Sequence, residues 1–180
     1  HQYEFPDDPD EGRRIFAEQK KKFYYPVKDS ADRDRYFFRR VILGVDRAVN
    51  YVAALPQWDG RNFIADGTSQ GGGMALIIAG FNPHISACAA NVPAMCDHQA
   101  TRDGRQNGWP GLIGNNPAAE KVAPYYDVVN FARDIKCPVL MSVGFIDSTC
   151  SPGGVYAAYN QIQARKEMFR MPGEGHALTD

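Results

Sequence analysis

The sequence predicts an α/β fold in which a mostly parallel sheet is flanked by helices. Four short apolar stretches, at 62–65, 86–92, 138–143 and 166–171, have the length and composition of buried strands. Segments with helical spacing of apolar residues separate them. Strands that alternate with helices are typical of a parallel sheet with both faces covered. The whole chain, 1–180, fits a single domain.

Four helices are expected between and around these strands. The first begins at Asp29 or Ser30, either of which can cap a helix, and its apolar stripe ends before Pro56. The second runs from Gln70 to about residue 79, with Gly80 as its C-terminal stop. The third and fourth are expected at 126–135 and 152–164.

Two segments are expected to lie outside this regular pattern. Residues 1–30 are rich in charge and proline, and we interpret them as a surface connection. Residues 97–125 are rich in Gly, Asn and Pro, which predicts a loop excursion over the active-site face. No strand is expected before Ser30, so the sheet is predicted to lack N-terminal strands. The chain is therefore interpreted as the C-terminal, catalytic portion of a fold.

Composition gives no support for several classes of function. The formal net charge of −1 gives no reason to propose a basic surface for nucleic acid, and no apolar run reaches the roughly 18 residues that cross a bilayer. The four cysteines form no CxxC pair and show no metal-type spacing with the histidines, so neither a metal nor a cofactor is expected. Cys88 and Cys137 are interpreted as buried core residues; a Cys88–Cys96 disulfide is left open. The start of the chain has no signal peptide and leaves the compartment unknown.

The segment Gly67-Thr68-Ser69-Gln70-Gly71 matches the G-x-S-x-G nucleophile elbow. In this motif the serine lies in a strained turn between a strand and a helix, and small neighbours avoid collisions there. The predicted strand before Ser69 and the helix after it fit that setting. The alternative is a tight turn with an exposed serine. We predict that Ser69 is a nucleophile.

A nucleophilic serine needs a base and an acid, which follow it along the chain in this type of fold. Asp147 follows the strand 138–143, and His176 follows the last strand on a Gly-flanked loop. We predict Asp147 as the acid and His176 as the base, although Asp147 could merely cap a turn. Asp97 also follows a strand and is a rival acid.

Two further histidines and the oxyanion hole complete the candidate chemistry. His84 and His98 precede Asp147, which breaks the expected order, so both are interpreted as structural or surface residues. The backbone N–H of Gln70, at a helix N-terminus, is expected to donate to the oxyanion. The second donor normally comes from a loop after an earlier strand, and the segment His1-Gln2-Tyr3 is a weak candidate for it.

From about residue 36 to the C-terminus the sequence resembles the acetyl xylan esterase and cephalosporin C deacetylase family of α/β-hydrolases. The resemblance is carried by Tyr36–Arg40, Asp46–Val49, Trp58–Gly60, Thr68–Gly72, Pro93–Asp97, Gly104–Arg105, Gly108–Pro110, Tyr126–Ala132, Gly144–Asp147 and Gly175–His176. It implies an α/β-hydrolase-type fold with Ser69, Asp147 and His176 as the catalytic residues. It also implies removal of acetyl groups from carbohydrates. Family members often carry an acidic or aromatic residue after the catalytic histidine, where this chain has Ala177, and they have a longer N-terminal half.

The expected partner is a small-molecule or oligosaccharide acetyl ester, and a homo-oligomer is left open. Trp109 and Tyr125 are candidate substrate-binding residues, because an aromatic face can support a sugar ring; packing of the loop is the alternative role. A secreted or periplasmic location would suit such a substrate. The alternatives are a prolyl-oligopeptidase-type serine peptidase and a non-catalytic hydrolase fragment.

Overall fold

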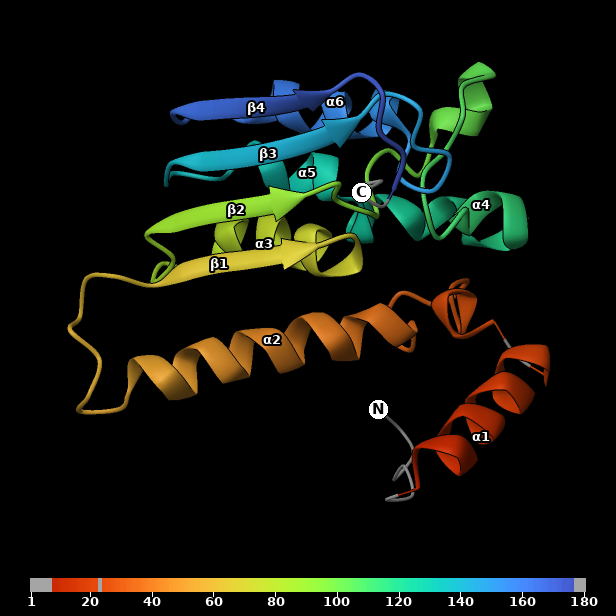
Figure 1. Cartoon of the computed structure of the whole chain (residues 1–180), viewed down its shortest axis with the longest axis horizontal. Helices are drawn as coiled ribbons and strands as arrows, with labels where there is room; N and C mark the ends of the chain where they lie inside the picture. The colour runs from red at the N-terminus through yellow and green to blue at the C-terminus, as the bar shows by residue number, and fades with distance from the viewer. Residues whose placement is uncertain (1–7, 23, 177–180) are drawn as a thin grey trace.

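A four-stranded parallel sheet forms the centre of the computed structural model, which describes residues 8–22 and 24–176. The strands lie side by side in chain order (Figure 1): β1 (Ile64–Thr68), β2 (Ala87–Asn91), β3 (Val139–Gly144) and β4 (Lys166–Met171). Every neighbouring pair is parallel. The predicted α/β class and all four strands are therefore confirmed, with β1 displaced two to three residues toward Ser69.

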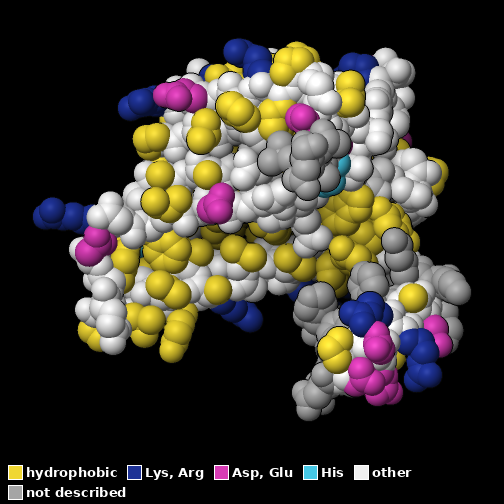
Figure 2. Space-filling model, viewed as in Figure 1, with side chains coloured by type: hydrophobic (Ala, Val, Ile, Leu, Met, Phe, Trp, Pro, Cys, Tyr) yellow, Lys and Arg dark blue, Asp and Glu magenta, His cyan; other side chains and the backbone are white. Residues whose placement is uncertain are grey.

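Helices cover one face of this sheet. α3 (Gln70–Phe81), α5 (Val128–Ala132) and α6 (Pro152–Gln161) lie behind the strands in Figure 1, and α2 (Phe37–Ala53) packs against α3. On the opposite face Ile64, Leu140 and Phe169 are exposed, and Figure 2 shows hydrophobic side chains spread over it. Within the described residues the expected covering of both faces is therefore wrong, because every helix that packs on the sheet lies on the same side.

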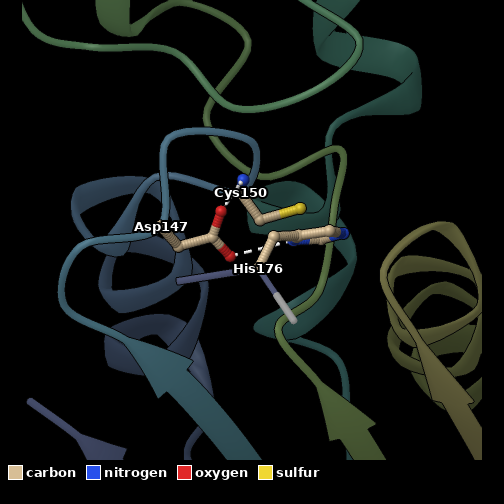
Figure 3. A group of neighbouring side chains, drawn as sticks. All are labelled: Asp147, Cys150 and His176. Carbon is tan, nitrogen blue, oxygen red and sulfur yellow. Dashed lines mark hydrogen bonds and ion pairs between the residues drawn. The ribbon is translucent and has the colours of Figure 1, made fainter. Parts of the chain in front are cut away.

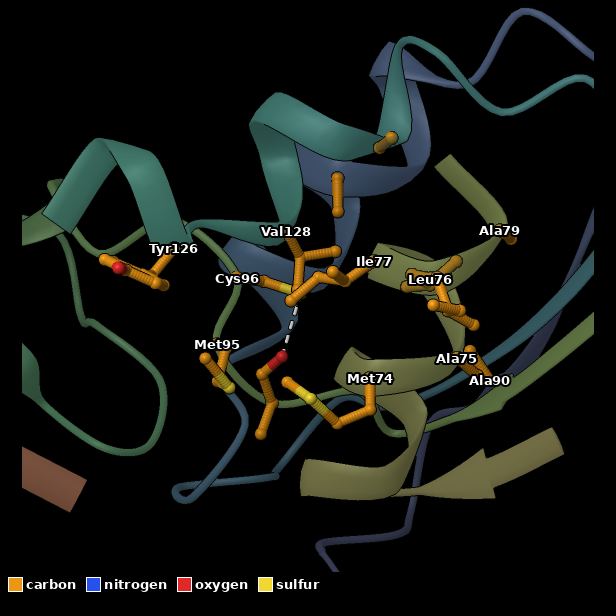
Figure 4. Packing of buried hydrophobic residues seen from close by; sticks show 14 of the residues in the cluster. Met74, Ala75, Leu76, Ile77, Ala79, Ala90, Met95, Cys96, Tyr126 and Val128 are labelled. Atoms are coloured by element: carbon orange, nitrogen blue, oxygen red, sulfur yellow. Dashed lines mark hydrogen bonds between the residues drawn. The ribbon is translucent and has the colours of Figure 1, made fainter. Parts of the chain in front are cut away.

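The core lies between the sheet and its helices. Residues 72–79 of α3 are all buried, as expected for a helix that is apolar around its whole circumference. Figure 4 shows Met74 and Ile77 of this helix on the side of Met95 and Val128, and Leu76 on the side of Ala90. The burial of α3 fixes the residue that precedes it, Ser69, against the end of β1.

The surface connection expected at 1–30 contains a helix whose described side chains are mostly exposed, and the predicted start of the following helix is wrong. Residues expected as a surface connection include α1 (Pro9–Lys22), whose start follows standard capping chemistry: Asp8 accepts the N–H of Asp10 at 2.9 Å, and Pro9 is the first helical residue. α2 begins at Phe37 and not at Asp29 or Ser30. Asp29 has a left-handed backbone with φ of 55°, which stops a helix there, and a short 3₁₀ turn (Tyr25–Val27) precedes it.

Gly80 does not end α3, which continues to Phe81. A Cβ at Gly80 would lie 2.6 Å from the carbonyl oxygen of Phe131, so this glycine permits the close approach of α5. α5 and α6 are shorter than the helices expected at 126–135 and 152–164. Asp127 caps α5 by accepting the N–H of Val129 at 3.0 Å.

Residues 97–125 are not an irregular loop throughout. They contain short helical pieces: 3₁₀ helices at Ala100–Asp103, Pro117–Lys121 and Ala123–Tyr126, and α4 (Leu112–Asn115). Part of the segment lies against the loop that follows β3, because the N–H of Trp109 donates to the carbonyl of Thr149 at 2.6 Å. No helix in the described part of the chain has the length and apolar character needed to span a bilayer.

Candidate active site

Ser69 stands at the turn between β1 and α3, with φ of 58° and ψ of −119°. A left-handed backbone is rare for a residue with a side chain and is held only where its surroundings enforce it. Its N–H donates to Asn91 and its carbonyl accepts from Gly73 and Ala94, at 2.9 to 3.0 Å. A Cβ at Gly67 would lie 2.3 Å from the backbone of Gly71, so Gly67 must lack one. The turn therefore has the backbone geometry expected of a nucleophile elbow.

The imidazole of His176 joins two side chains from different loops. Its Nε2 lies 2.9 Å from the hydroxyl oxygen of Ser69, and its Nδ1 lies 2.9 Å from Oδ2 of Asp147. Asp147 follows β3 and His176 follows β4, so the three side chains meet at the carboxyl edge of the sheet. The structure therefore brings together the three residues that the sequence singled out, from positions up to 107 residues apart.

Asp147 is held so that one oxygen faces the imidazole. The other oxygen, Oδ1, accepts the N–H groups of Thr149 and Cys150, both at 2.8 Å. The side chain of Asp147 is fully buried, whereas that of His176 is 30% exposed. A carboxylate with these bonds stays oriented and favours the imidazole tautomer that carries its proton on Nδ1. In that tautomer Nε2 is free to accept the proton of the Ser69 hydroxyl.

The loop that carries His176 crosses directly over the end of β3. A Cβ at Gly144 would lie 2.4 Å from the carbonyl oxygen of Gly175 and 2.6 Å from that of Glu174. The N–H of Ile146 also donates to the Glu174 carbonyl at 3.1 Å. Gly144 thus sets how closely the histidine loop approaches the loop that bears Asp147.

Cys150 is a residue of this site that the sequence reasoning missed. Its backbone N–H donates to Oδ1 of Asp147 at 2.8 Å. Burial, with a further contribution from the Asp147 charge, raises the pKa of the thiol to about 12. Asp147, Cys150 and His176 offer ligand atoms that all lie within 4.8 Å of one another. Figure 3 shows the three side chains next to one another. The one indication in the sequence that Cys150 lies at this site is its position three residues after Asp147.

The other acidic and histidine residues considered for the site, Asp97, His98 and His84, contact residues other than Ser69. Asp97 forms an ion pair with Arg105, and its backbone N–H donates to Asp127. His98 is buried, and its backbone N–H donates to Asp127 at 2.7 Å. The ring of His84 packs edge-on against Trp58, 5.3 Å between centroids. None of these contacts involves Ser69, so the described geometry favours Asp147 and His176.

Gln70 is the first residue of α3, where backbone N–H groups have no acceptor within the helix. Its N–H is therefore available in the position expected of an oxyanion donor. The side-chain oxygen of Gln70 accepts a hydrogen bond from the hydroxyl of Tyr25 at 3.2 Å. The segment His1-Gln2-Tyr3, considered for the second donor, lies outside the described residues.

The two predicted substrate-binding residues differ in their surroundings. Trp109 is partly buried and packs against Phe38 and Tyr25, with ring centroids 5.9 and 6.4 Å apart. Tyr25 also donates a hydrogen bond to the side chain of Gln70. The aromatic group formed by Tyr25, Phe38 and Trp109 therefore extends to the residue that follows Ser69. Tyr125 is exposed, and Arg33 lies over its ring at 5.0 Å. Its described contacts do not connect it to Ser69 or Gln70.

Comparison with known proteins places these features in a family. The family model described as acetyl xylan esterase (AXE1) matches residues 8–106 and 114–179. The acetyl esterase Axe7A of Xylanibacter ruminicola is 42% identical over 152 residues, which are 82% of this chain and 35% of that protein.

Solved esterases have the same fold. An acetyl xylan esterase from Thermoanaerobacterium superposes with a TM-score of 0.77 at 28% identity, covering 87% of this chain and 54% of that one. An acetyl xylan esterase from Paenibacillus sp. R4 gives 0.76 at 27% identity, covering 83% and 51%. The chain thus spans about a third to a half of the length of these relatives. It has an α/β-hydrolase-type fold and belongs to the acetyl xylan esterase (AXE1) family.

Proposed function

We propose that the protein is a serine esterase that removes acetyl groups from carbohydrate esters through an acyl-enzyme formed on Ser69. The observation that carries this proposal is the continuous pair of 2.9 Å contacts from Ser69 through His176 to Asp147. A hydroxyl, an imidazole and a carboxylate in this order can perform nucleophilic acyl transfer. Family membership and the name of the relative Axe7A support an acetyl ester as the substrate.

The first half of the reaction forms the acyl-enzyme. His176 takes the proton of the Ser69 hydroxyl through Nε2 as the oxygen attacks the ester carbonyl. The carbonyl oxygen becomes an oxyanion, which the N–H of Gln70 stabilises. Imidazolium forms beside the buried carboxylate of Asp147, which stabilises the positive charge. His176 then gives its proton to the departing sugar hydroxyl, and the acetyl group remains on Ser69.

The second half repeats these roles with water. His176 accepts a proton from water, which attacks the acetyl-enzyme, and acetate leaves as Ser69 regains its proton. Each oxyanion donor typically contributes about 3 kcal/mol to the stabilisation of the transition state. Full activity therefore requires a second donor in addition to the N–H of Gln70. The aromatic group of Tyr25 and Trp109, beside Gln70, supplies an apolar face on which a sugar ring could stack.

Acetate release distinguishes this proposal from its alternatives. The intact protein carrying this chain is assayed with acetylated xylo-oligosaccharides, p-nitrophenyl acetate and peptide amides. We expect turnover of the two esters and none of the amides; amide turnover above ester turnover would favour a peptidase. Ser69→Ala is expected to lose about 10⁶-fold in kcat.

The matched control for this assay is Ser148→Ala. Ser148 is exposed beside Asp147, and its carbonyl, which the substitution keeps, accepts from Gln106. This variant should keep the parental rate. Equal turnover by Ser69→Ala and the parent would disprove the serine mechanism and favour a non-catalytic role for this chain.

A further inference from the structure

Three side chains with metal-binding atoms converge beside Ser69. They are the carboxylate of Asp147, the thiol of Cys150 and the imidazole of His176, drawn in Figure 3, and their ligand atoms lie within 4.8 Å of one another. Asp147 and Cys150 are buried, and both lie on the loop after β3, whereas His176 comes from the loop after β4. The group is the one set of three such residues found in residues 8–22 and 24–176.

We propose that these three side chains form a binding site for Zn²⁺, and that the bound ion inhibits the enzyme. One oxygen, one nitrogen and one sulfur ligand are a set that Zn²⁺ accepts and that Mg²⁺ and Ca²⁺, which prefer oxygen, do not. Zn²⁺ bonds of about 2.0 to 2.3 Å in a tetrahedron separate neighbouring ligand atoms by roughly 3.3 to 3.8 Å. The group therefore needs shifts of under about 1.5 Å to reach this geometry.

The charges balance when the ion binds. The thiol of Cys150 loses its proton to solvent and becomes a thiolate, and Asp147 is a carboxylate. Together they neutralise the two positive charges of the ion, and a neutral ring nitrogen of His176 is the third ligand. Solvent takes the fourth position, which leaves no charge uncompensated in a buried site. The partly exposed ring of His176 marks the side from which the ion enters.

Inhibition follows from the same contacts, and this part of the inference rests on the proposed function. If Nε2 of His176 binds the ion, the contact with the Ser69 hydroxyl is lost. If Nδ1 binds it, the contact with Asp147 is lost. In either case His176 can no longer accept the serine proton. Zn²⁺ would then lower kcat without competing with the ester for its binding site.

The experiment measures metal binding and turnover separately on the intact protein, free of a histidine tag and treated with a chelator. Titration with Cd²⁺, a Zn²⁺ substitute, should produce the ultraviolet thiolate-to-cadmium absorption with one ion per chain. Zn²⁺ should inhibit p-nitrophenyl acetate hydrolysis, and EDTA should restore it. In Cys150→Ser the absorption should disappear. Inhibition of this variant is measured relative to its own metal-free rate, and the Zn²⁺ concentration that gives half-inhibition should rise about 100-fold or more.

Cys137→Ser is the matched control, since Cys137 is also buried but lies before β3, at the opposite end of that strand from Asp147. It should keep the parental absorption and the parental inhibition. An unchanged absorption or unchanged half-inhibition in Cys150→Ser would overturn the site. Cd²⁺ binding without any turnover in metal-free parent would instead contradict the proposed function and leave the site intact, so the two failures are distinguishable.

Discussion

Gly144→Ala tests whether activity depends on the position of the loop that carries His176, because the added methyl group should displace this loop and leave the rest of the fold in place. The new Cβ would lie 2.4 Å from the carbonyl oxygen of Gly175, and real Cβ atoms essentially never approach below 3.0 Å. The loop must retreat by about 1 Å to reach ordinary contact, and it carries His176 as the next residue. Both 2.9 Å contacts of the imidazole would lengthen beyond hydrogen-bond distance.

A displacement of about 1 Å in a catalytic group can cost about 100-fold in rate. We therefore expect kcat/KM for p-nitrophenyl acetate to fall about 100-fold, which corresponds to about 2.7 kcal/mol of transition-state stabilisation. Overpacking of this kind also costs about 1 to 3 kcal/mol of stability. Urea unfolding and far-ultraviolet circular dichroism would establish that the variant is folded under the assay conditions.

Two glycine substitutions in the same region serve as controls. A Cβ at Gly175 meets its nearest neighbour, the carbonyl oxygen of Ile146, at an ordinary 3.8 Å, and a Cβ at Gly153 meets no atom within 4 Å. Gly175→Ala and Gly153→Ala should therefore keep activity within about 3-fold of the parent, since neither forces a shift. A folded Gly144→Ala with near-parental activity, or an equal loss in Gly175→Ala, would refute the reasoning.

Three further predictions test the remaining assignments. Asp147→Asn should lower kcat about 10⁴-fold with native melting behaviour, because the amide no longer favours the tautomer of His176 that can act as base; a loss under about 10-fold would argue against its role. Asp97→Asn should leave kcat within a few-fold, since Asp97 pairs with Arg105, and a loss equal to that of Asp147→Asn would reverse the assignment of the acid. Burial, opposed in part by a nearby carboxylate, lowers the pKa of His98 in the fold, so the unfolded chain binds more protons below its ordinary pKa near 6.5. The free energy of unfolding should therefore fall as pH drops from 7 to 5, and urea unfolding of His98→Asn should show a smaller fall; an identical slope would contradict this origin.

The catalytic geometry could be predicted because each of its residues follows a strand. The motif around Ser69 and the positions of Asp147 and His176 after two apolar strands were sufficient, since parallel strands bring their carboxyl ends to one edge. The structure adds the contacts that orient them, such as the two N–H groups on Asp147. Their catalytic roles remain a proposal.

Other features depended on contacts that sequence spacing does not contain. Gly80 has the residue type of a helix stop, but the nearby Phe131 carbonyl explains its presence inside α3. The N–H of Cys150 reaches Asp147 because the loop beyond β3 folds back on itself, which spacing along the sequence does not reveal. The start of α1, by contrast, is visible in the sequence, because Asp8 and Pro9 are residue types typical of a helix N-terminus. The sequence analysis interprets them as part of a surface connection.

The central claim is that Ser69 is a hydroxyl nucleophile activated by His176, and covalent labelling tests it most directly. The intact protein is treated with a fluorophosphonate, digested, and analysed by mass spectrometry. We expect one phosphonylated residue, Ser69, with no label in Ser69→Ala and labelling slowed at least about 100-fold in His176→Asn. A label of equal intensity in Ser69→Ala, or attached to another residue of the parent, would contradict the account.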